Sequence, residues 1–401
     1  MDTVSYENFR KKLTIGDYIV ASYIIAIFVF ENEKYSMLFS IIQLLFFGYL
    51  AWMAFKTKKF PVNVATQWII IVALLALLYF CAGANKYVDS TSFVVAKNLL
   101  KAICIVYYLY TKDNEEFIII ATAIAGIIWG GFIVVSFLEN PLTSMELKYA
   151  SNSRIGAEIA GGNVNVVAMN MCFAFASCMH LAKDSLKKSK KVFWYLALVF
   201  ITISSFFTGT RKVLLVFAVM FLLANRNIKI RYKIMVLIAA IAAYLVLMNV
   251  DTFYFLLGHK IDFFRSDAYK MYDHSDQIRR DLLIQSWKMF TDRPWGSGFG
   301  CVQAALGVYA HNNYMEVLAS LGLIGFILYY GVYVWELCKS YLYRRDNSCQ
   351  FCFYTLVGIM ILEIGQITCY YPMIYVFIPL IEYIIRYKGK KGKDFYESKN
   401  C

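Results

Sequence analysis

Long apolar segments recur along the chain, and each is followed by a short polar stretch. An α-helix rises 1.5 Å per residue, so about 20 apolar residues cross the roughly 30 Å hydrocarbon core of a bilayer. The pattern predicts an all-α polytopic membrane protein, a single integral-membrane domain over residues 1–401 with about 12 transmembrane helices. These helices are expected near residues 18–32, 37–55, 64–83, 93–110, 117–138, 163–182, 192–208, 212–225, 234–250, 313–336, 351–369 and 371–387.

The composition supports the same class of protein. Hydrophobic residues make up 60% of the 401 and charged residues only 17%, which is more apolar surface than a soluble core of this length hides. A net charge of +13 would suggest a nucleic-acid partner for a soluble domain, but in a membrane protein Lys and Arg first report orientation. We therefore expect membrane lipids, and no nucleic acid, as partners.

Lys and Arg concentrate in alternate connections between the apolar segments. Counted from a cytoplasmic start, the dense groups are Arg10–Lys12, Lys56–Lys59 with Lys112, Lys183–Lys191, Arg226–Lys233, Lys339–Arg345 and Arg386–Lys399. Short cytoplasmic loops carry an excess of Lys and Arg, so both termini are predicted to face the cytoplasm.

The outer connections include two long ones, near residues 139–162 and 251–312. Long loops in a compact protein usually carry function. The second contains equal numbers of acidic and basic residues, so an anion site in it must be a local clamp rather than a general basic field. We predict that this extracytoplasmic loop, residues 251–312, contains an amphipathic helix and forms part of the functional site.

The segment Thr208–Lys212 lies between the seventh and eighth apolar segments, at the predicted outer boundary. The hydroxyl of Thr210, the amides of a helix start and the guanidinium of Arg211 suit a phosphate or diphosphate. The physical reason is that Arg offers a bidentate fork and a helix N-terminus favours an anion. The alternative is an interfacial Arg211 that extends to lipid headgroups.

Arg279 opens an amphipathic stretch with apolar residues at helical spacing, and this stretch stops before Pro294. The spacing predicts a helix that lies over the bundle and directs Arg279 to the same volume as Arg211. The alternative for Arg279 is a solvated charge at a helix start.

The segment His311–Glu316 leads into the tenth apolar segment and places an imidazole at the start of that segment. Imidazole titrates near neutrality and accepts a hydroxyl proton, so His311 is a candidate base; the alternative is a structural histidine at a helix start. Glu316 lies inside the apolar segment, where a carboxylate usually orients a partner or lines a cavity. Asn312 is as well suited to a helix cap as to a substrate contact.

In this order, the residues resemble the O-antigen ligase and polymerase superfamily. The matching pieces are Thr208-Gly209-Thr210-Arg211, Arg279 fifteen residues before Pro294, Gly296-Ser297-Gly298, His311-Asn312-Asn313-Tyr314-Met315-Glu316 and Leu321-Gly322-Leu323-Ile324-Gly325. Earlier, Arg154 and Gly162-Asn163-Val164-Asn165 resemble the family's Arg followed by Gly-Asn-Pro-Asn, with Val164 in place of Pro. The ordered match covers about residues 150–330.

The resemblance implies a GT-C-like glycosyltransferase fold and a metal-independent, inverting enzyme without a cofactor. It implies that Arg211 and Arg279, with Thr210 beside them, bind the diphosphate of an undecaprenyl-diphosphate-linked oligosaccharide, and that His311 acts at the acceptor hydroxyl. Arg280 adjoins Arg279 and is the other candidate for the second clamp. Glu316 is the second catalytic candidate, and candidate substrate contacts are Arg154, Asn163, Asn165, Asn312 and Tyr314.

Within this class we predict a polymerase that joins lipid-linked repeat units into capsule, O-antigen or exopolysaccharide at the outer leaflet of the bacterial cytoplasmic membrane. The preference rests on the number and diversity of such polymerases in the superfamily. Its expected partners are the lipid-linked donor and acceptor, with a chain-length regulator and a flippase of the same pathway. One alternative is a ligase that transfers finished glycan to a terminal acceptor. A transporter or flippase is less favoured, because the sequence shows neither internal repeats nor midplane polar groups on broken helices.

Overall fold

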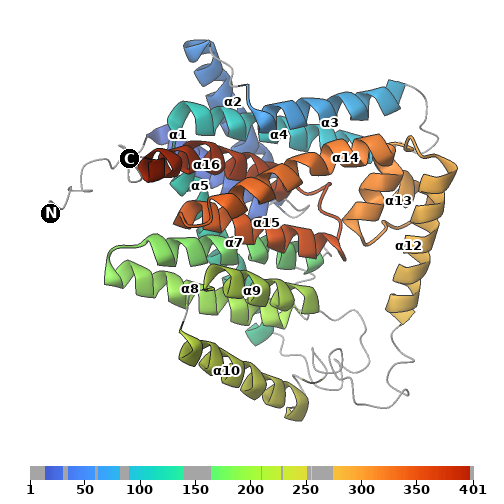
Figure 1. The fold of residues 1–401 in the computed structure, drawn as a ribbon. Helices are drawn as coiled ribbons and strands as arrows, with labels where there is room; N and C mark the ends of the chain where they lie inside the picture. Colours follow the sequence, from blue (N-terminus) through green and yellow to red (C-terminus); the bar gives the residue numbers. More distant parts are fainter. Residues whose placement is uncertain are drawn as a thin grey trace.

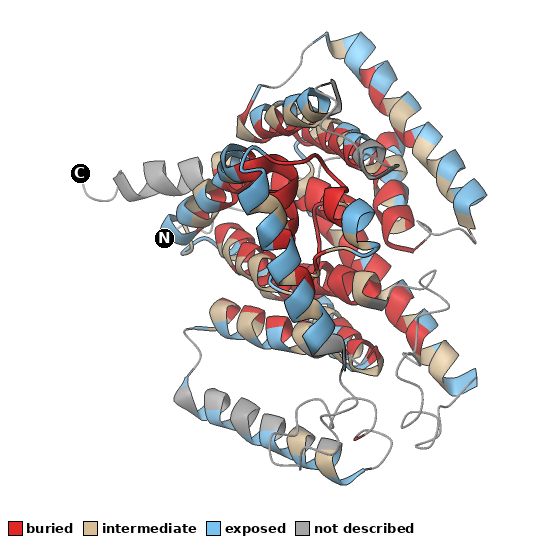
Figure 2. Cartoon of the chain, turned by 90° about the vertical axis from the view of Figure 1, so that its right-hand side faces the viewer, coloured by how far each residue is buried: buried red, intermediate tan, exposed pale blue. Residues whose placement is uncertain are grey.

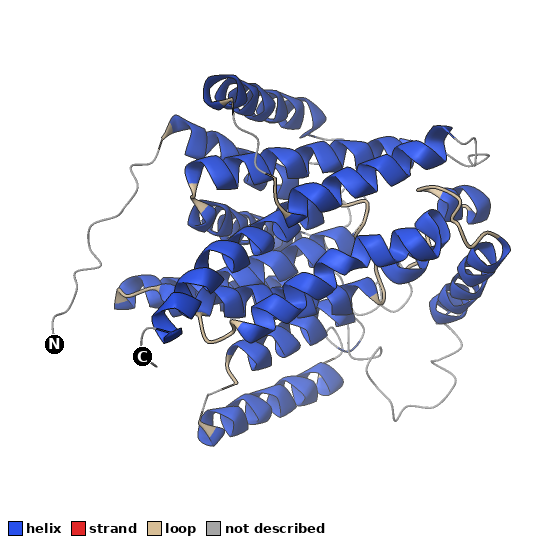
Figure 3. Ribbon diagram, turned by 45° about the horizontal axis from the view of Figure 1, so that its top comes forward, coloured by secondary structure: helices blue, strands red, loops and turns tan. Residues whose placement is uncertain are grey.

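The structure, a computed structural model, describes residues 14–29, 35–58, 62–81, 90–139, 164–208, 210–226, 229–250, 254 and 274–397. The regular structure of these residues is helical (Figure 3). Each predicted apolar segment coincides with a helix: α1 (Ile15–Val29), α2 (Ser36–Thr57), α3 (Val64–Cys81), α4 (Ser90–Lys112), α5 (Glu115–Glu139), α7 (Val164–Asp184), α8 (Lys188–Phe207), α9 (Arg211–Ala224), α10 (Ile230–Asn249), α14 (Asn313–Leu342), α15 (Asn347–Glu363) and α16 (Pro372–Glu397).

Six helices of the described part of the chain are long and apolar enough to cross a membrane, judged by length and composition. They are α2, α4, α5, α7, α8 and α14. The regular structure of the described residues is thus all-helical, in agreement with a polytopic membrane protein. The number of 12 spans and the GT-C topology stay predictions.

The bundle is built around α7, which packs against α5, α8, α9 and α15 (Figure 1). Buried residues gather along the central helices, whereas α2 carries many exposed positions (Figure 2). Leu44 and Phe55 of α2 are 74% and 81% exposed, although both are large and apolar. Such side chains on an outer helix are what lipid contact requires, because the bilayer core is as apolar as they are.

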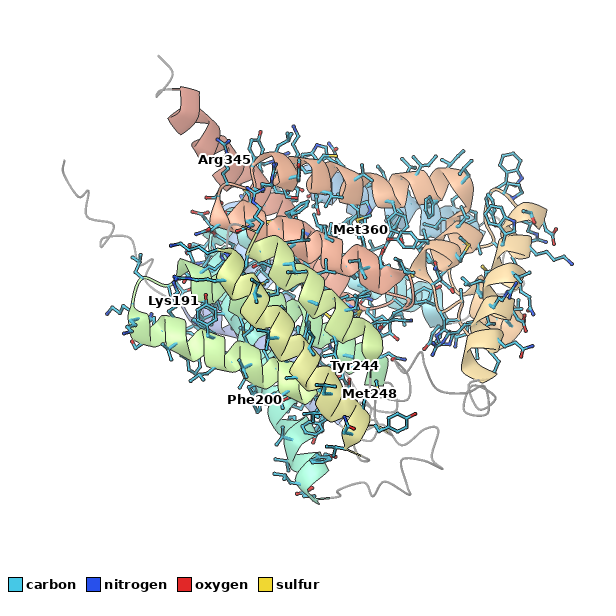
Figure 4. All side chains as sticks on the ribbon, turned by 60° about the horizontal axis from the view of Figure 1, so that its bottom comes forward. Lys191, Phe200, Tyr244, Met248, Arg345 and Met360 are labelled. Atoms are coloured by element: carbon cyan, nitrogen blue, oxygen red, sulfur yellow. The ribbon has the colours of Figure 1, made fainter. Side chains whose placement is uncertain are left out.

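The two ends of the bundle differ in what they carry. Lys191 and Arg345 lie at one end, and α12 (His274–Asp292) lies at the other (Figure 4). Because both basic residues belong to connections that the charge pattern assigns to the cytoplasm, this separation is the one that the predicted sidedness requires. The orientation in the membrane itself stays a prediction.

Two further helices, α12 and α13 (Cys301–Leu306), form part of the predicted extracytoplasmic loop. α12 ends at Asp292, before Pro294, as the sequence predicts. It begins at His274, five residues before the expected start at Arg279, because residues 274–278 contain neither Gly nor Pro to interrupt it. It packs against α14 and buries Leu282 and Ser286. Residues 255–273 of the loop lie outside the described part of the chain.

α14 is interrupted at Gly322, where φ is 65° and ψ is −173°. The turn that follows α12 packs against α14 at this interruption. Leu323 N–H donates to Pro294 O at 3.0 Å, and Gly298 N–H donates to Ser320 O at 2.8 Å. A broken helix among the membrane segments was not expected from the sequence. The break is filled by the protein's own backbone and by the hydroxyl of Tyr79, which donates to Leu321 O at 2.9 Å, so it does not restore the transporter hypothesis.

Candidate active site

A cavity of about 310 Å³ lies where α9, α12 and the end of α15 meet the chain just before α14. Its volume falls at the lower end of the range for small-ligand pockets, roughly 300–1,000 Å³. Spacing along the helices explains the lining, since residues three or four apart share one helix face. The lining residues are Lys212 and Leu215 of α9, Arg279 and Leu283 of α12, Ala310 and His311, and Ile361, Ile364 and Gly365.

His311 is half-buried and precedes α14 with a left-handed backbone, φ 55°. Its ring contacts that of Tyr309, with centroids 4.4 Å apart. Burial lowers the pKa of His311 from its ordinary value of 6.5 to about 4, and the positive charges of Arg279 and Lys212 act in the same direction. The imidazole is therefore neutral at physiological pH and is able to accept a proton.

Arg279 and Arg280 differ in their environment. Arg279 lines the cavity, whereas Arg280 is exposed. Consecutive helix residues are about 100° apart, so only one of the pair faces inward. Arg279 is therefore the arginine of the pair that lines the cavity, and Arg280 lies at the surface of α12.

Lys212 is a second cation of the cavity, and its sequence position alone did not predict this. It lies in the first turn of α9, one residue after Arg211, and its Nζ donates to Gly365 O. Two cationic side chains, and no acidic one, occur among the described residues that line the cavity. A diphosphate suits such a lining, because both its charge and its acceptor oxygens find partners.

The threonine hydroxyls next to Arg211 do not line the cavity. Thr210 is 8% exposed, and its hydroxyl lies 3.5 Å from Thr208 O, to which it donates. Thr208 in turn donates to Ser205 O at 2.7 Å. These hydroxyls stabilise the α8–α9 turn locally. The side chain of Arg211, and residues Arg154 and Asn163, lie outside the described part of the structure.

The polar residues at the start of α14 hold that helix in place. Asn312 caps α14, since its Oδ1 accepts from Met315 N–H at 3.0 Å, and its Nδ2 donates to Ile364 O at 2.9 Å. Tyr314 donates to Met360 O at 2.9 Å. Neither residue lines the cavity, so the capping alternative for Asn312 is the one that the geometry shows.

Glu316 is fully buried and does not line the cavity either. Its two oxygens accept hydrogen bonds from Ala310 N–H and from the hydroxyl of Tyr370. The structure thus brings Glu316 next to the backbone that carries His311, behind the lining of the cavity. A role as base finds no support in this geometry.

Asn165 is the second residue of α7 and lies close to the α15–α16 link. Its carbonyl accepts from Gln366 Nε2 at 2.9 Å, and Gln366 follows Gly365, which lines the cavity. Asn165 therefore lies next to a neighbour of the cavity lining and does not line the cavity itself.

Part of the chain matches a known protein family. Residues 196–330 match the family described as O-Antigen ligase. The resemblance to the O-antigen ligase and polymerase superfamily is confirmed. This match spans α8 to the middle of α14 and includes Lys212, Arg279 and His311, but it ends before the α15 residues of the cavity. No curated protein matches the chain. The match over residues 196–330 and the apolar helices together support a multi-pass membrane protein similar to the O-antigen ligases.

Proposed function

We propose that this protein transfers a growing glycan from undecaprenyl diphosphate to a sugar hydroxyl of an incoming lipid-linked repeat unit, at the outer leaflet of the cytoplasmic membrane. The observation that carries the proposal is the composition of the cavity. Lys212 and Arg279 supply two positive charges, and Leu215, Leu283, Ile361 and Ile364 supply an apolar surface next to them. A polyprenyl diphosphate has the same division between an anionic head and an apolar tail.

In this proposal the cations act on the leaving group. Negative charge grows on the diphosphate as the glycosidic bond breaks, and fixed cations in a site with little water stabilise it more than bulk water does. Arg211 follows Thr210 at the start of the same helix that provides Lys212, and we assign it to the same clamp.

His311 accepts the proton of the attacking hydroxyl. The hydroxyl oxygen forms a bond to the anomeric carbon while the bond from that carbon to the diphosphate breaks, and undecaprenyl diphosphate leaves with the electron pair. A single displacement of this kind inverts the anomeric centre. We favour polymerisation over transfer of finished glycan because the superfamily contains many diverse polymerases.

The experiment compares adjacent arginines of α12. Arg279→Ala should lower turnover with a purified lipid-linked donor by about 10²–10³, as the loss of one charge-stabilising donor does in other enzymes. Arg279→Lys should recover little activity, because an ammonium does not reproduce the bidentate fork. Arg280→Ala is the matched control and should retain activity, since Arg280 is exposed. A folded Arg279→Ala protein that transfers glycan at the normal rate would overturn the proposed clamp.

A further inference from the structure

One buried carboxylate connects both ends of the segment 300–310, which contains α13. Glu316 is 0% exposed, and its Oε2 accepts from Ala310 N–H at 3.0 Å. Its Oε1 accepts from the hydroxyl of Tyr370 at 2.7 Å. That hydroxyl also accepts from Gly300 N–H at 3.0 Å. The two ends of the segment are thereby tied to the first turn of α14 through four groups: the Glu316 carboxylate, the Tyr370 hydroxyl and the amides of Gly300 and Ala310.

This connection lies directly before His311. The backbone of His311 is left-handed, with φ 55°, a conformation that is uncommon for a residue with a side chain. On one side the Ala310 amide is held by Glu316. On the other side Asn312 caps α14 and donates to Ile364 O. His311 is thus held from both neighbours while its own side chain lines the cavity.

Tyr370 belongs to the link between α15 and α16 and comes from a part of the chain beyond the family match. Its ring meets that of Phe299 edge to face, with centroids 6.2 Å apart. The hydroxyl is therefore aimed by ring packing at Glu316 and Gly300.

We propose that Glu316 and Tyr370 are positioning residues that form a latch, defined by the four groups named above, and that this latch fixes the His311 imidazole at the cavity. Its consequence for the rate rests on the proposed function, whereas the latch itself rests on the geometry. A displacement of about 1 Å in a reacting group costs on the order of 10²-fold in rate, so holding the backbone before the base has a measurable effect.

The first test is Tyr370→Phe, which removes the hydroxyl and leaves the ring. The turnover number should fall by about 10-fold to 100-fold, because His311 is less well placed. The KM for a lipid-linked oligosaccharide extracted from the source cells should change little, since Lys212 and Arg279 keep their positions. Amide hydrogen exchange in residues 300–311 should become faster, while exchange in α7 stays the same. Tyr341→Phe, the same change at an exposed position in the last turn of α14, is the control.

The second test is Glu316→Gln, which keeps the size of the side chain but offers one acceptor oxygen instead of two. It should reduce turnover and leave the acid limb of the pH profile where it is in the wild type. Glu316→Gln combined with Tyr370→Phe should be close to the more severe single change, because both act on one latch. An acid limb that disappears in Glu316→Gln would identify Glu316 as the titrating base and overturn the positioning role.

The outcomes separate the latch from the proposed function. Unchanged exchange of residues 300–311 in Tyr370→Phe would overturn the latch whatever reaction the protein catalyses. Faster exchange with unchanged turnover would show that the segment is held but does not position the base, and would overturn the proposal. A wild-type protein that releases no undecaprenyl diphosphate from the donor would overturn the proposed function, and the exchange rates would still test the latch.

Discussion

At the scale of the residue, the surroundings of His311 fix both its protonation state and its strength as a base. Burial, Arg279 and Lys212 together lower the pKa of its imidazole to about 4, so the free protein carries it neutral over the physiological range. A base with so low a pKa accepts a proton weakly. A bound diphosphate would offset the two cations and raise the pKa of His311 toward its ordinary value. Donor binding would thereby strengthen the base at the moment when it is needed.

The first prediction concerns the pH dependence of kcat/KM, which reports the free enzyme. The neutral imidazole is the active form, so the wild-type rate should be level from pH 6 to 8 and fall only near the His311 pKa of about 4. Lys212→Gln removes one of the charges that oppose protonation. The pKa of His311 should rise, and activity should be lost at a higher pH than in the wild type.

The measurement is the initial rate of donor consumption between pH 4 and 8. Lys212→Gln also weakens donor binding and so lowers the rate at every pH. The test is therefore decided by the pH at which activity is lost, and not by the absolute rate. Arg280→Gln removes the same charge from an exposed position and should not move the limb. A limb that stays in place in Lys212→Gln would mean that Lys212 does not act on the group that titrates.

At the scale of the element, the glycine motifs before and after His311 contact each other through Gly296 and Gly322. A Cβ on Gly296 would meet Gly322 N at 2.6 Å, and a Cβ on Gly322 would meet the carbonyl carbon of Trp295 at 2.2 Å. Both glycines have positive φ, 98° and 65°. The turn after α12 and the break in α14 therefore require glycine for conformation and for space.

The second prediction follows from this contact. Gly322→Ala should destabilise the protein by about 1–3 kcal/mol from backbone strain alone, with the clash against the Trp295 backbone in addition. Gly331→Ala in the same helix is the control, because a Cβ there meets nothing within 4 Å and Ala is the better helix former. Thermal unfolding of both proteins in lipid nanodiscs should lower the midpoint for Gly322→Ala only. Equal midpoints would contradict the close approach.

The helices could be predicted from the sequence, but the way they assemble around the cavity could not. Hydropathy locates the helices because burial in lipid depends on local composition alone. The cavity depends on which distant helices meet, and no local pattern reports that α9, α12 and the end of α15 share one volume. For the same reason, neither Lys212 nor Tyr370 could be predicted as a site residue from the sequence. Lys212 stands beside Arg211, but the residue of α9 that faces the cavity depends on helix phase, and Tyr370 lies in a link without a motif of its own.

Glu316 illustrates a different limit of prediction from sequence. Its place in an apolar segment predicted a functional and possible catalytic residue. The structure instead shows both of its oxygens bonded to a backbone amide and a tyrosine hydroxyl. A buried carboxylate has to be satisfied by hydrogen bonds, whether or not it takes part in chemistry.

At the scale of the whole molecule, the two ends of the bundle are assigned to opposite sides of the membrane. The third prediction is that a reporter fused after Asn347 reports the cytoplasm and one fused near Asp273 reports the outside, because the basic connections remain inside. The fusion after Asn347 follows Arg344 and Arg345, and the fusion near Asp273 precedes α12. Two fusions on the same side would contradict the predicted sidedness, and a cytoplasmic report near Asp273 would place the cavity and its lipid-linked donor in different compartments.

The last prediction separates chain growth from the transfer of finished glycan. In polymerisation the donor and the acceptor are both anchored to the membrane by undecaprenyl diphosphate, so a cell without the protein should display single repeat units on its surface. In ligation the chains are completed elsewhere, so the same deletion should leave long glycan on undecaprenyl diphosphate and none on the terminal acceptor. We expect the first result, measured by sizing the surface glycan and the lipid-linked pool.

Complementation with His311→Gln should reproduce the deletion, since glutamine accepts no proton and a well-placed general base contributes roughly 10²–10⁴ in rate. Complementation with Arg280→Ala should restore long chains. Long lipid-linked chains in the deletion would identify a ligase that uses the same clamp on the same donor.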